Sequence, residues 1–169
     1  MNNQSSDVQI LPIAEEYITG FRQCLDSVAR ERQYLGFVEA PGLDVIREFV
    51  RSNIAQDLPQ FVAIEGGTVV GWCDISPESL PGFTHCGRLG MGVHKDFRGK
   101  GIGNRLVVAT LDEAREKKLE RVELEVFASN QPAIELYKKV GFAVEGVKKK
   151  GRKLDGVYDD VVCMALLFE

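Results

Sequence analysis

The most informative part of this chain is Leu89-Gly-Met-Gly-Val93 followed by Arg98-Gly-Lys-Gly-Ile-Gly103-Asn104. The second segment places three glycines at alternate positions immediately before a predicted helix. Glycines let the backbone approach a ligand closely and turn its N–H groups inward. The first N–H groups of a helix lack intrahelical acceptors, and the helix dipole adds partial positive charge there. The segment therefore predicts an anion site of the kind that holds a pyrophosphate.

Two other phosphate-binding motifs do not fit this segment. A Walker A loop requires Lys and Ser or Thr after its last glycine, whereas Gly103 is followed by Asn104-Arg105. The dinucleotide-binding fingerprint is GxGxxG in an early βαβ unit, whereas the spacing here is GxGxG and lies late in the chain. The remaining alternative is a glycine-rich turn that only connects a strand to a helix.

Hydrophobic periodicity on both sides of this segment predicts alternating strands and helices. Gly66-Gly67 predicts a two-residue hairpin turn, and Pro132 and Gly141 bracket a short helix. We expect a mixed α/β sheet in one domain, residues 8–169, preceded by a disordered polar tail at residues 1–7. The expected strands are residues 8–11, 60–65, 68–75, 85–93, 121–127, 142–150 and 157–168. The expected helices are residues 14–32, 42–55, the segment that follows the glycines and ends at residue 118, and residues 131–140.

Composition excludes several classes of protein. The 169 residues carry a net charge of −4, which argues against nucleic acid as the main partner, since such a surface needs excess positive charge. No apolar run approaches the length of a membrane span, and the polar N-terminus does not resemble a signal peptide. The only histidines, His85 and His94, form no cluster with the cysteines, so no metal site is expected. A cytoplasmic protein is expected, with four reduced thiols, Cys24, Cys73, Cys86 and Cys163.

A second motif, combined with the first, resembles a known family. Arg98 to Gly103 matches the Q/R-x-x-G-x-G/A acetyl-CoA motif of the GNAT superfamily of N-acetyltransferases. The companion pattern N-x-x-A-x-x-x-Y-x-x-x-G-F follows after one predicted helix and one predicted strand, as Asn130, Ala133, Tyr137, Gly141 and Phe142. The resemblance implies the GNAT fold, a mixed and mostly antiparallel twisted sheet that is splayed at the cofactor site and flanked by helices. It also implies acetyl-CoA as the co-substrate.

The resemblance assigns roles to individual residues. The backbone of Met91, Gly92 and Val93 is expected to hold the pantetheine arm and polarise the thioester carbonyl. Arg98 would reach a phosphate, although a solvated loop arginine is an equal alternative. Tyr137 would protonate the departing thiolate, and its alternative is a core aromatic residue. The remaining residues expected to bind the cofactor are Gly99, Lys100, Gly101, Ile102, Gly103, Asn104, Asn130 and Ala133.

The reaction also needs a base, because an amine near neutral pH is mostly protonated. Glu125 is placed similarly to the glutamate that acts as base in ribosomal-protein N-acetyltransferases. A partly desolvated carboxylate there would have a raised pKa, but an exposed glutamate or an ion pair is an equal alternative. Asp74, Glu39 and His85 are weaker candidates, and water can also relay the proton.

The expected activity is acetylation of a primary amine by its direct attack on the thioester. The amine belongs to a small molecule, such as an amino acid-like compound, a polyamine or an antibiotic. Alternatives are a protein N-terminal acetyltransferase and a non-catalytic acetyl-CoA-binding module. The first two helices and residues 34–41 would form the acceptor wall, and Asp159-Asp160 could face a cationic acceptor. The basic run 148–153 predicts a solvated hairpin, and by analogy the edge of the final strands could form a homodimer.

Overall fold

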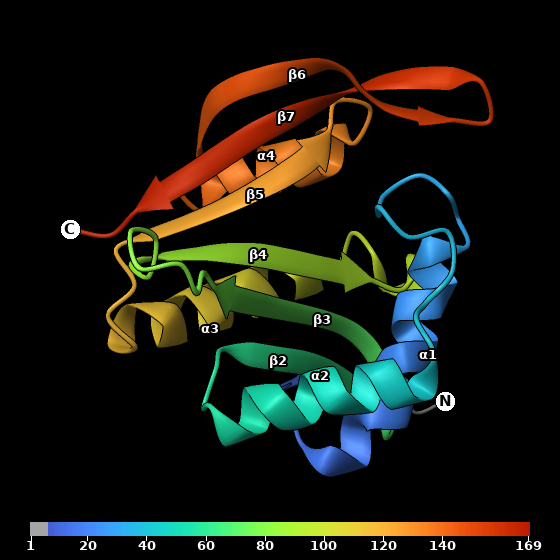
Figure 1. Ribbon diagram of the computed structural model, residues 1–169. Coiled ribbons are helices and arrows are strands. Elements are labelled where there is room, and N and C mark those ends of the chain that lie inside the picture. The colour runs from blue at the N-terminus through green and yellow to red at the C-terminus, as the bar shows by residue number, and fades with distance from the viewer. Residues whose placement is uncertain (1–6) are drawn as a thin grey trace.

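The computed structural model describes residues 7–169, so most of the tail predicted at residues 1–7 lies outside the described residues. Within residues 7–169, seven strands form one sheet in the order β1-β2-β3-β4-β5-β7-β6 (Figure 1). The mixed α/β architecture predicted from the element order is confirmed. The strands are β1 Gln9–Pro12, β2 Gln60–Glu65, β3 Thr68–Pro77, β4 Cys86–Val93, β5 Arg121–Phe127, β6 Ala143–Leu154 and β7 Val157–Leu167, and the helices are α1 Ile18–Ala29, α2 Leu43–Ala55, α3 Ile102–Glu116 and α4 Gln131–Lys139.

The sheet opens between its two central strands. β4 and β5 pair in parallel only through Cys86↔Arg121, Gly87↔Val122 and Arg88↔Glu123. Beyond that point β4 stays paired with β3 as far as Val93, while β5 stays paired with β7 as far as Phe127. The two strands consequently diverge toward their C-terminal ends (Figure 1). This divergence is the splay expected for the cofactor site.

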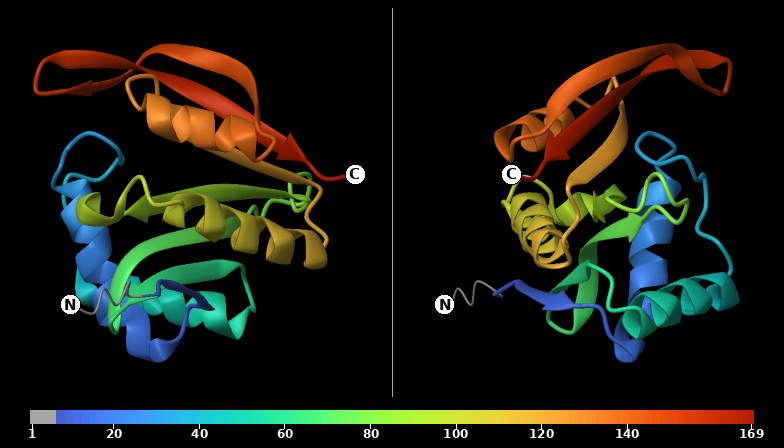
Figure 2. Two further views of the ribbon diagram at one scale, coloured as in Figure 1. Left: turned by 180° about the vertical axis from the view of Figure 1, so that it is seen from behind. Right: turned by 60° about the vertical axis from the view of Figure 1, so that its left-hand side comes forward.

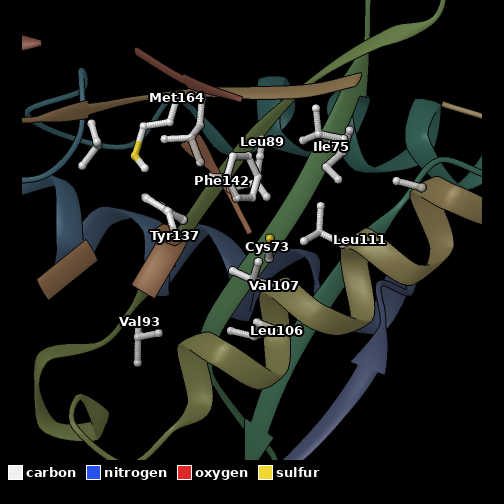
Figure 3. Packing of buried hydrophobic residues seen from close by; sticks show 14 of the residues in the cluster. Cys73, Ile75, Leu89, Val93, Leu106, Val107, Leu111, Tyr137, Phe142 and Met164 are labelled. Atoms are coloured by element: carbon white, nitrogen blue, oxygen red, sulfur yellow. The ribbon is translucent and has the colours of Figure 1, made fainter. Parts of the chain in front are cut away.

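Helices cover the two faces of the sheet unequally. α3 and α4 pack on one face, and α1 and α2 pack on the other over β2, β3 and β4 (Figure 2). The alternation of β3 explains the two cores, since successive side chains point to opposite faces. Cys73 belongs to the α3 side, shown in Figure 3, while Trp72 belongs to the α1 and α2 side.

Two elements differ by more than two residues from their sequence-based bounds, whereas the others agree within two residues. The helix predicted at residues 14–32 begins with a 3-10 turn, Glu15–Tyr17, and its α-helical part ends at Ala29. The strand predicted at residues 142–150 continues to Leu154, and Asp155-Gly156 makes the turn with φ angles of 51° and 77°. The added residues, Gly-Arg-Lys-Leu, show no alternation of apolar and polar side chains, and they are extended through pairing with β7.

Candidate functional site

The glycine-rich loop ends in a left-handed turn that starts α3. Gly99 and Gly101 have φ angles of 74° and 79°, a region that L side chains rarely adopt. Gly101 is the N-cap, and the first intrahelical bond is donated by Arg105 N to Gly101 O at 3.2 Å. A Cβ atom added at Gly99 or Gly101 would meet nothing within 4 Å. The loop therefore borders open space, and the free N–H groups of the first turn of α3 can bind an anion there.

Gly103 marks the place where three elements meet. A Cβ atom added at Gly103 would lie 3.3 Å from both Met91 Cε and Leu136 Cδ2, and 3.8 Å from Val93 Cγ2. These neighbours belong to β4 and α4. The two sequence motifs, which are separated by a helix and a strand, are thus brought to one place beside the end of β4.

The backbone of β4 presents donors to the gap between β4 and β5. His94 N donates to Val70 O on β3 at 2.8 Å. Successive residues of a strand direct their N–H groups to opposite sides, so Val93 and Met91 direct theirs away from β3. Beyond Arg88 no residue of β5 is in register with β4. These N–H groups therefore have no partner on β5, which leaves them available for the role that the resemblance implies.

Arg98 connects this strand end to the loop between α1 and α2. Its Nε donates to Val93 O at 2.9 Å, and its terminal nitrogens donate to the two carboxylate oxygens of Glu31 at 2.6 and 2.9 Å. The guanidinium also lies 4.7 Å from the centre of the Tyr34 ring. The structure thus gives Arg98 a set of protein partners that the sequence pattern does not show.

Tyr137 lies on the buried face of α4, as the helical spacing predicts. Its ring packs edge-on against Phe142, with 5.8 Å between ring centres, in the cluster that includes Cys73 (Figure 3). Burial, together with the nearby Cys73 thiol, raises the pKa of Tyr137 well above its ordinary value. The phenol is protonated at neutral pH, and the raised pKa makes it a weaker acid than an exposed tyrosine.

Asn130 has a structural role in addition to its predicted one. Its side-chain oxygen accepts from Ala133 N at 3.3 Å and caps α4. Asn130 also lines a cavity of about 540 Å³ between the start of α4, the loop after α1 and the β6–β7 hairpin. Asp159, which could face an acceptor, lines this cavity too but accepts hydrogen bonds from Ser129. Asp160 accepts hydrogen bonds from the Lys149 side chain and from the Lys150 N–H.

A second cavity, of about 500 Å³, lies on the α1 and α2 side of the sheet. Its floor is formed by β3 and β4, including Gly90 and Met91, and its walls are largely apolar. Asp74 and Arg88 are the only charged residues among the described residues that line it. The predicted acceptor wall contributes to it. The apolar wall residues are Phe21, Leu25, Leu35, Phe37, Pro41, Val45, Ile46, Phe49 and Trp72.

The carboxylates considered as bases differ sharply in their surroundings. Asp74 is partly buried in the floor of this cavity, and desolvation raises its pKa to about 7. Glu125 has a side chain that is 41% exposed and forms an ion pair with Lys148, which is the alternative that the sequence left open for it. Glu39 is exposed near Arg30, and His85 lies beside Cys86 at the opposite end of β4. Asp74 could have been singled out in the sequence as the one charged residue in the apolar stretch 69–75.

Residues 7–169 contain no group of three or more His, Cys, Asp or Glu side chains that could hold a metal ion. Within the same range no helix is long and apolar enough to cross a membrane.

The chain is similar to known acetyltransferases. The model of the Acetyltransferase (GNAT) family matches residues 25–142. The L-amino acid N-acetyltransferase AaaT of Escherichia coli (strain K12) is 34% identical over 109 residues, which are 64% of this chain and 67% of that protein. The L-amino acid N-acyltransferase MnaT of the same strain is 32% identical over 87 residues, which are 51% of this chain and 51% of that protein. The fold is shared with a solved structure from Sinorhizobium meliloti, a GNAT superfamily phosphinothricin acetyltransferase (Pat) in complex with AcCoA. The TM-score is 0.84 at 16% sequence identity, and the match covers 95% of this chain and 88% of that chain.

Proposed function

This chain belongs to the GNAT acetyltransferase family, and on that basis we propose that it transfers the acetyl group of acetyl-CoA to the primary amine of a small, apolar, amino acid-like molecule. The observation that carries this proposal is the apolar cavity of about 500 Å³ whose floor includes Gly90 and Met91. Cavities of this size hold small molecules. The same strand borders the cofactor gap, so an amine in the cavity can reach a thioester held in the gap.

The glycine-rich loop and β4 serve the donor. Acetyl-CoA supplies an activated acetyl thioester. The free N–H groups at the start of α3 bind its pyrophosphate, and the N–H groups of Met91 and Val93 hold the arm that carries the thioester. The Val93 N–H then stabilises the negative charge that develops on the carbonyl oxygen as the amine attacks. Tyr137 donates its proton to the sulfur as the carbon–sulfur bond breaks.

The lining of the cavity favours an amino acid-like acceptor. An amino acid with an apolar side chain carries an ammonium, a carboxylate and a hydrophobic group. In the cavity, Asp74 can receive the ammonium, Arg88 can receive the carboxylate, and the largely apolar walls can receive the hydrophobic group. A polyamine or an aminoglycoside would instead place several positive charges against apolar side chains, which is unfavourable without partners. The names of AaaT and MnaT, both directed to L-amino acids, support the same class.

An acceptor screen tests this proposal. Acetyl-CoA binding is first established by calorimetry, and release of CoA thiol is then measured with L-phenylalanine, L-leucine, spermidine, an aminoglycoside and peptides with free N-termini. Mass spectrometry identifies each acetylated product. We expect the highest kcat/KM with the two apolar amino acids. Acetyl-CoA binding without any acetylated product would support a non-catalytic module. A higher kcat/KM with spermidine or with peptides would overturn the proposed substrate class.

A further inference from the structure

We propose that Asp74 binds the ammonium group of the acceptor and removes its proton, the role that the sequence pattern assigns to Glu125. This inference rests on the proposed function, because it concerns the acceptor cavity of the same site. It adds a specific residue for amine recognition and proton transfer.

Asp74 lies in the floor of the acceptor cavity, beside the strand that borders the cofactor gap. Asp74 lies opposite Gly90 in the β3–β4 ladder, and its side chain lines the acceptor cavity. A Cβ atom added at Gly90 would lie 3.8 and 4.0 Å from the two Asp74 carboxylate oxygens. Gly90 therefore leaves room beside that carboxylate, directly over β4 and one residue before Met91. An amine hydrogen-bonded to Asp74 would lie next to the strand that presents N–H groups to the thioester.

The side chains around Asp74 leave the carboxylate available to a cation. No hydrogen bond or ion pair joins it to another residue of the described range. α1 and α2 contribute only apolar side chains to the cavity, and Cys73 points to the opposite face of the sheet. Arg88 lines the cavity from β4, but its side chain is 58% exposed and lies 3.6 Å from Glu123. An ammonium ion is therefore a suitable partner for Asp74.

A neighbouring amide supports the assignment. Gln60 is the partner of Asp74 on β2, and its oxygen accepts from Asn53 Nδ2 at 2.8 Å. Its nitrogen is the one buried side-chain polar atom without a partner in the part of the chain that is described. Such an unpaired donor is unfavourable. It makes no hydrogen bond to the Asp74 carboxylate, which therefore stays free for a cation.

The titration of Asp74 is consistent with this chemistry. Desolvation raises its pKa to about 7, which suits a base that works near neutral pH. Glu125 instead lies on β5, exposed and paired with Lys148. The Glu125 carboxylate thus already has a cationic partner within the protein.

The proton transfers balance as follows. Asp74 takes one proton from the ammonium, and the freed lone pair forms the carbon–nitrogen bond. The carbon–sulfur bond breaks, and the sulfur receives the Tyr137 proton. The nitrogen then loses a second proton, which restores the phenol of Tyr137. Asp74 finally releases its proton to solvent, so the products are the amide, the CoA thiol and one proton.

The variant Asp74→Asn tests the inference, with Asp44→Asn as the matched control because the Asp44 side chain is 96% exposed on α2. The kcat/KM for L-phenylalanine is measured from pH 5.5 to 9, together with calorimetric binding of phenethylamine. We expect Asp74→Asn to lower kcat/KM by about 100-fold or more, to remove the acidic limb near pH 7 and to abolish phenethylamine binding. Acetyl-CoA affinity should stay as in the wild type, which shows that the variant is folded.

Glu125→Gln tests the competing assignment. Loss of the acidic limb in Glu125→Gln, with the limb retained in Asp74→Asn, would overturn the inference. Equal phenethylamine binding by Asp74→Asn and the wild type would overturn the ammonium-binding role. If the wild type acetylates no amine, the proposed function fails, whereas the phenethylamine measurement still decides whether Asp74 binds an ammonium.

Discussion

Gly92 and Gly90 lie on the same face of β4, the face toward Trp72 and Asp74, and should respond differently to the same substitution. A Cβ atom at Gly92 would lie 2.2, 2.6 and 2.9 Å from three carbons of the Trp72 indole. Trp72 is only 3% exposed and packs edge-on against Phe21, with 5.9 Å between ring centres. The ring cannot retreat without displacing α1. Gly92→Ala should therefore destabilise the fold by about 2 kcal/mol, within the usual cost of overpacking a core.

Gly90→Ala is the control for this prediction. Its added methyl group would meet only the Asp74 oxygens, at ordinary contact distances of 3.8 and 4.0 Å. We expect stability within about 0.5 kcal/mol of the wild type, as for a substitution without steric conflict. The methyl group nevertheless enters the acceptor cavity beside Asp74. The KM for the acceptor should therefore rise by about tenfold, which corresponds to about 1.4 kcal/mol of binding free energy.

Urea unfolding measures the difference directly, because Trp72 is the only tryptophan and reports on the site of the clash. At an unchanged m-value, Gly92→Ala should lower the midpoint. The thermal midpoint should fall by about 4–8 °C for a loss of about 2 kcal/mol. A Gly92→Ala protein as stable as the wild type would refute the packing described for Trp72. Equal destabilisation by Gly90→Ala would refute the open space assigned to Gly90.

Tyr137→Phe keeps the ring packed on Phe142 but removes the proton donor, so kcat should fall about 10²–10⁴-fold at an unchanged thermal midpoint; an unchanged kcat would contradict the acid role. Arg98→Lys loses the two-point contact with Glu31. We therefore expect kcat to fall and the acceptor KM to rise, while the calorimetric affinity for acetyl-CoA stays constant. A selective loss of that affinity would place Arg98 on a phosphate instead. The pKa of Asp74 is about 7 in the folded protein but about 4 when unfolded, so the folded state binds more protons between these values. The free energy of unfolding should therefore fall by roughly 2–4 kcal/mol from pH 4 to 7 relative to Asp74→Asn. Urea titrations at pH 5 and pH 8 measure this change, and an equal change in the two proteins would disprove the prediction.

The geometry of the glycine-rich loop was predictable because it depends on the local backbone. Glycines at alternate positions before a helix determine where N–H groups point, and these positions are adjacent in the chain. The spacing of the second motif on one helix likewise predicted that Tyr137 faces the core. The fold class followed from the order of strands and helices. Strand ends were less predictable, since the end of β6 at Leu154 is set by pairing with β7.

The acceptor half depended on contacts between distant segments. Alternation placed Glu125 on a face of β5 but could not show that the face is uncovered or that Lys148 lies beside it. Asp74 became the stronger candidate only once the β3–β4 register put it opposite Gly90, beneath α1 and α2. The sequence by itself determined the family, the two motifs and the buried position of Tyr137, because these depend on local backbone geometry and helical periodicity. The tertiary structure decided which carboxylate is desolvated and what surrounds the amine, because burial and charge pairing depend on which strands and helices pack together.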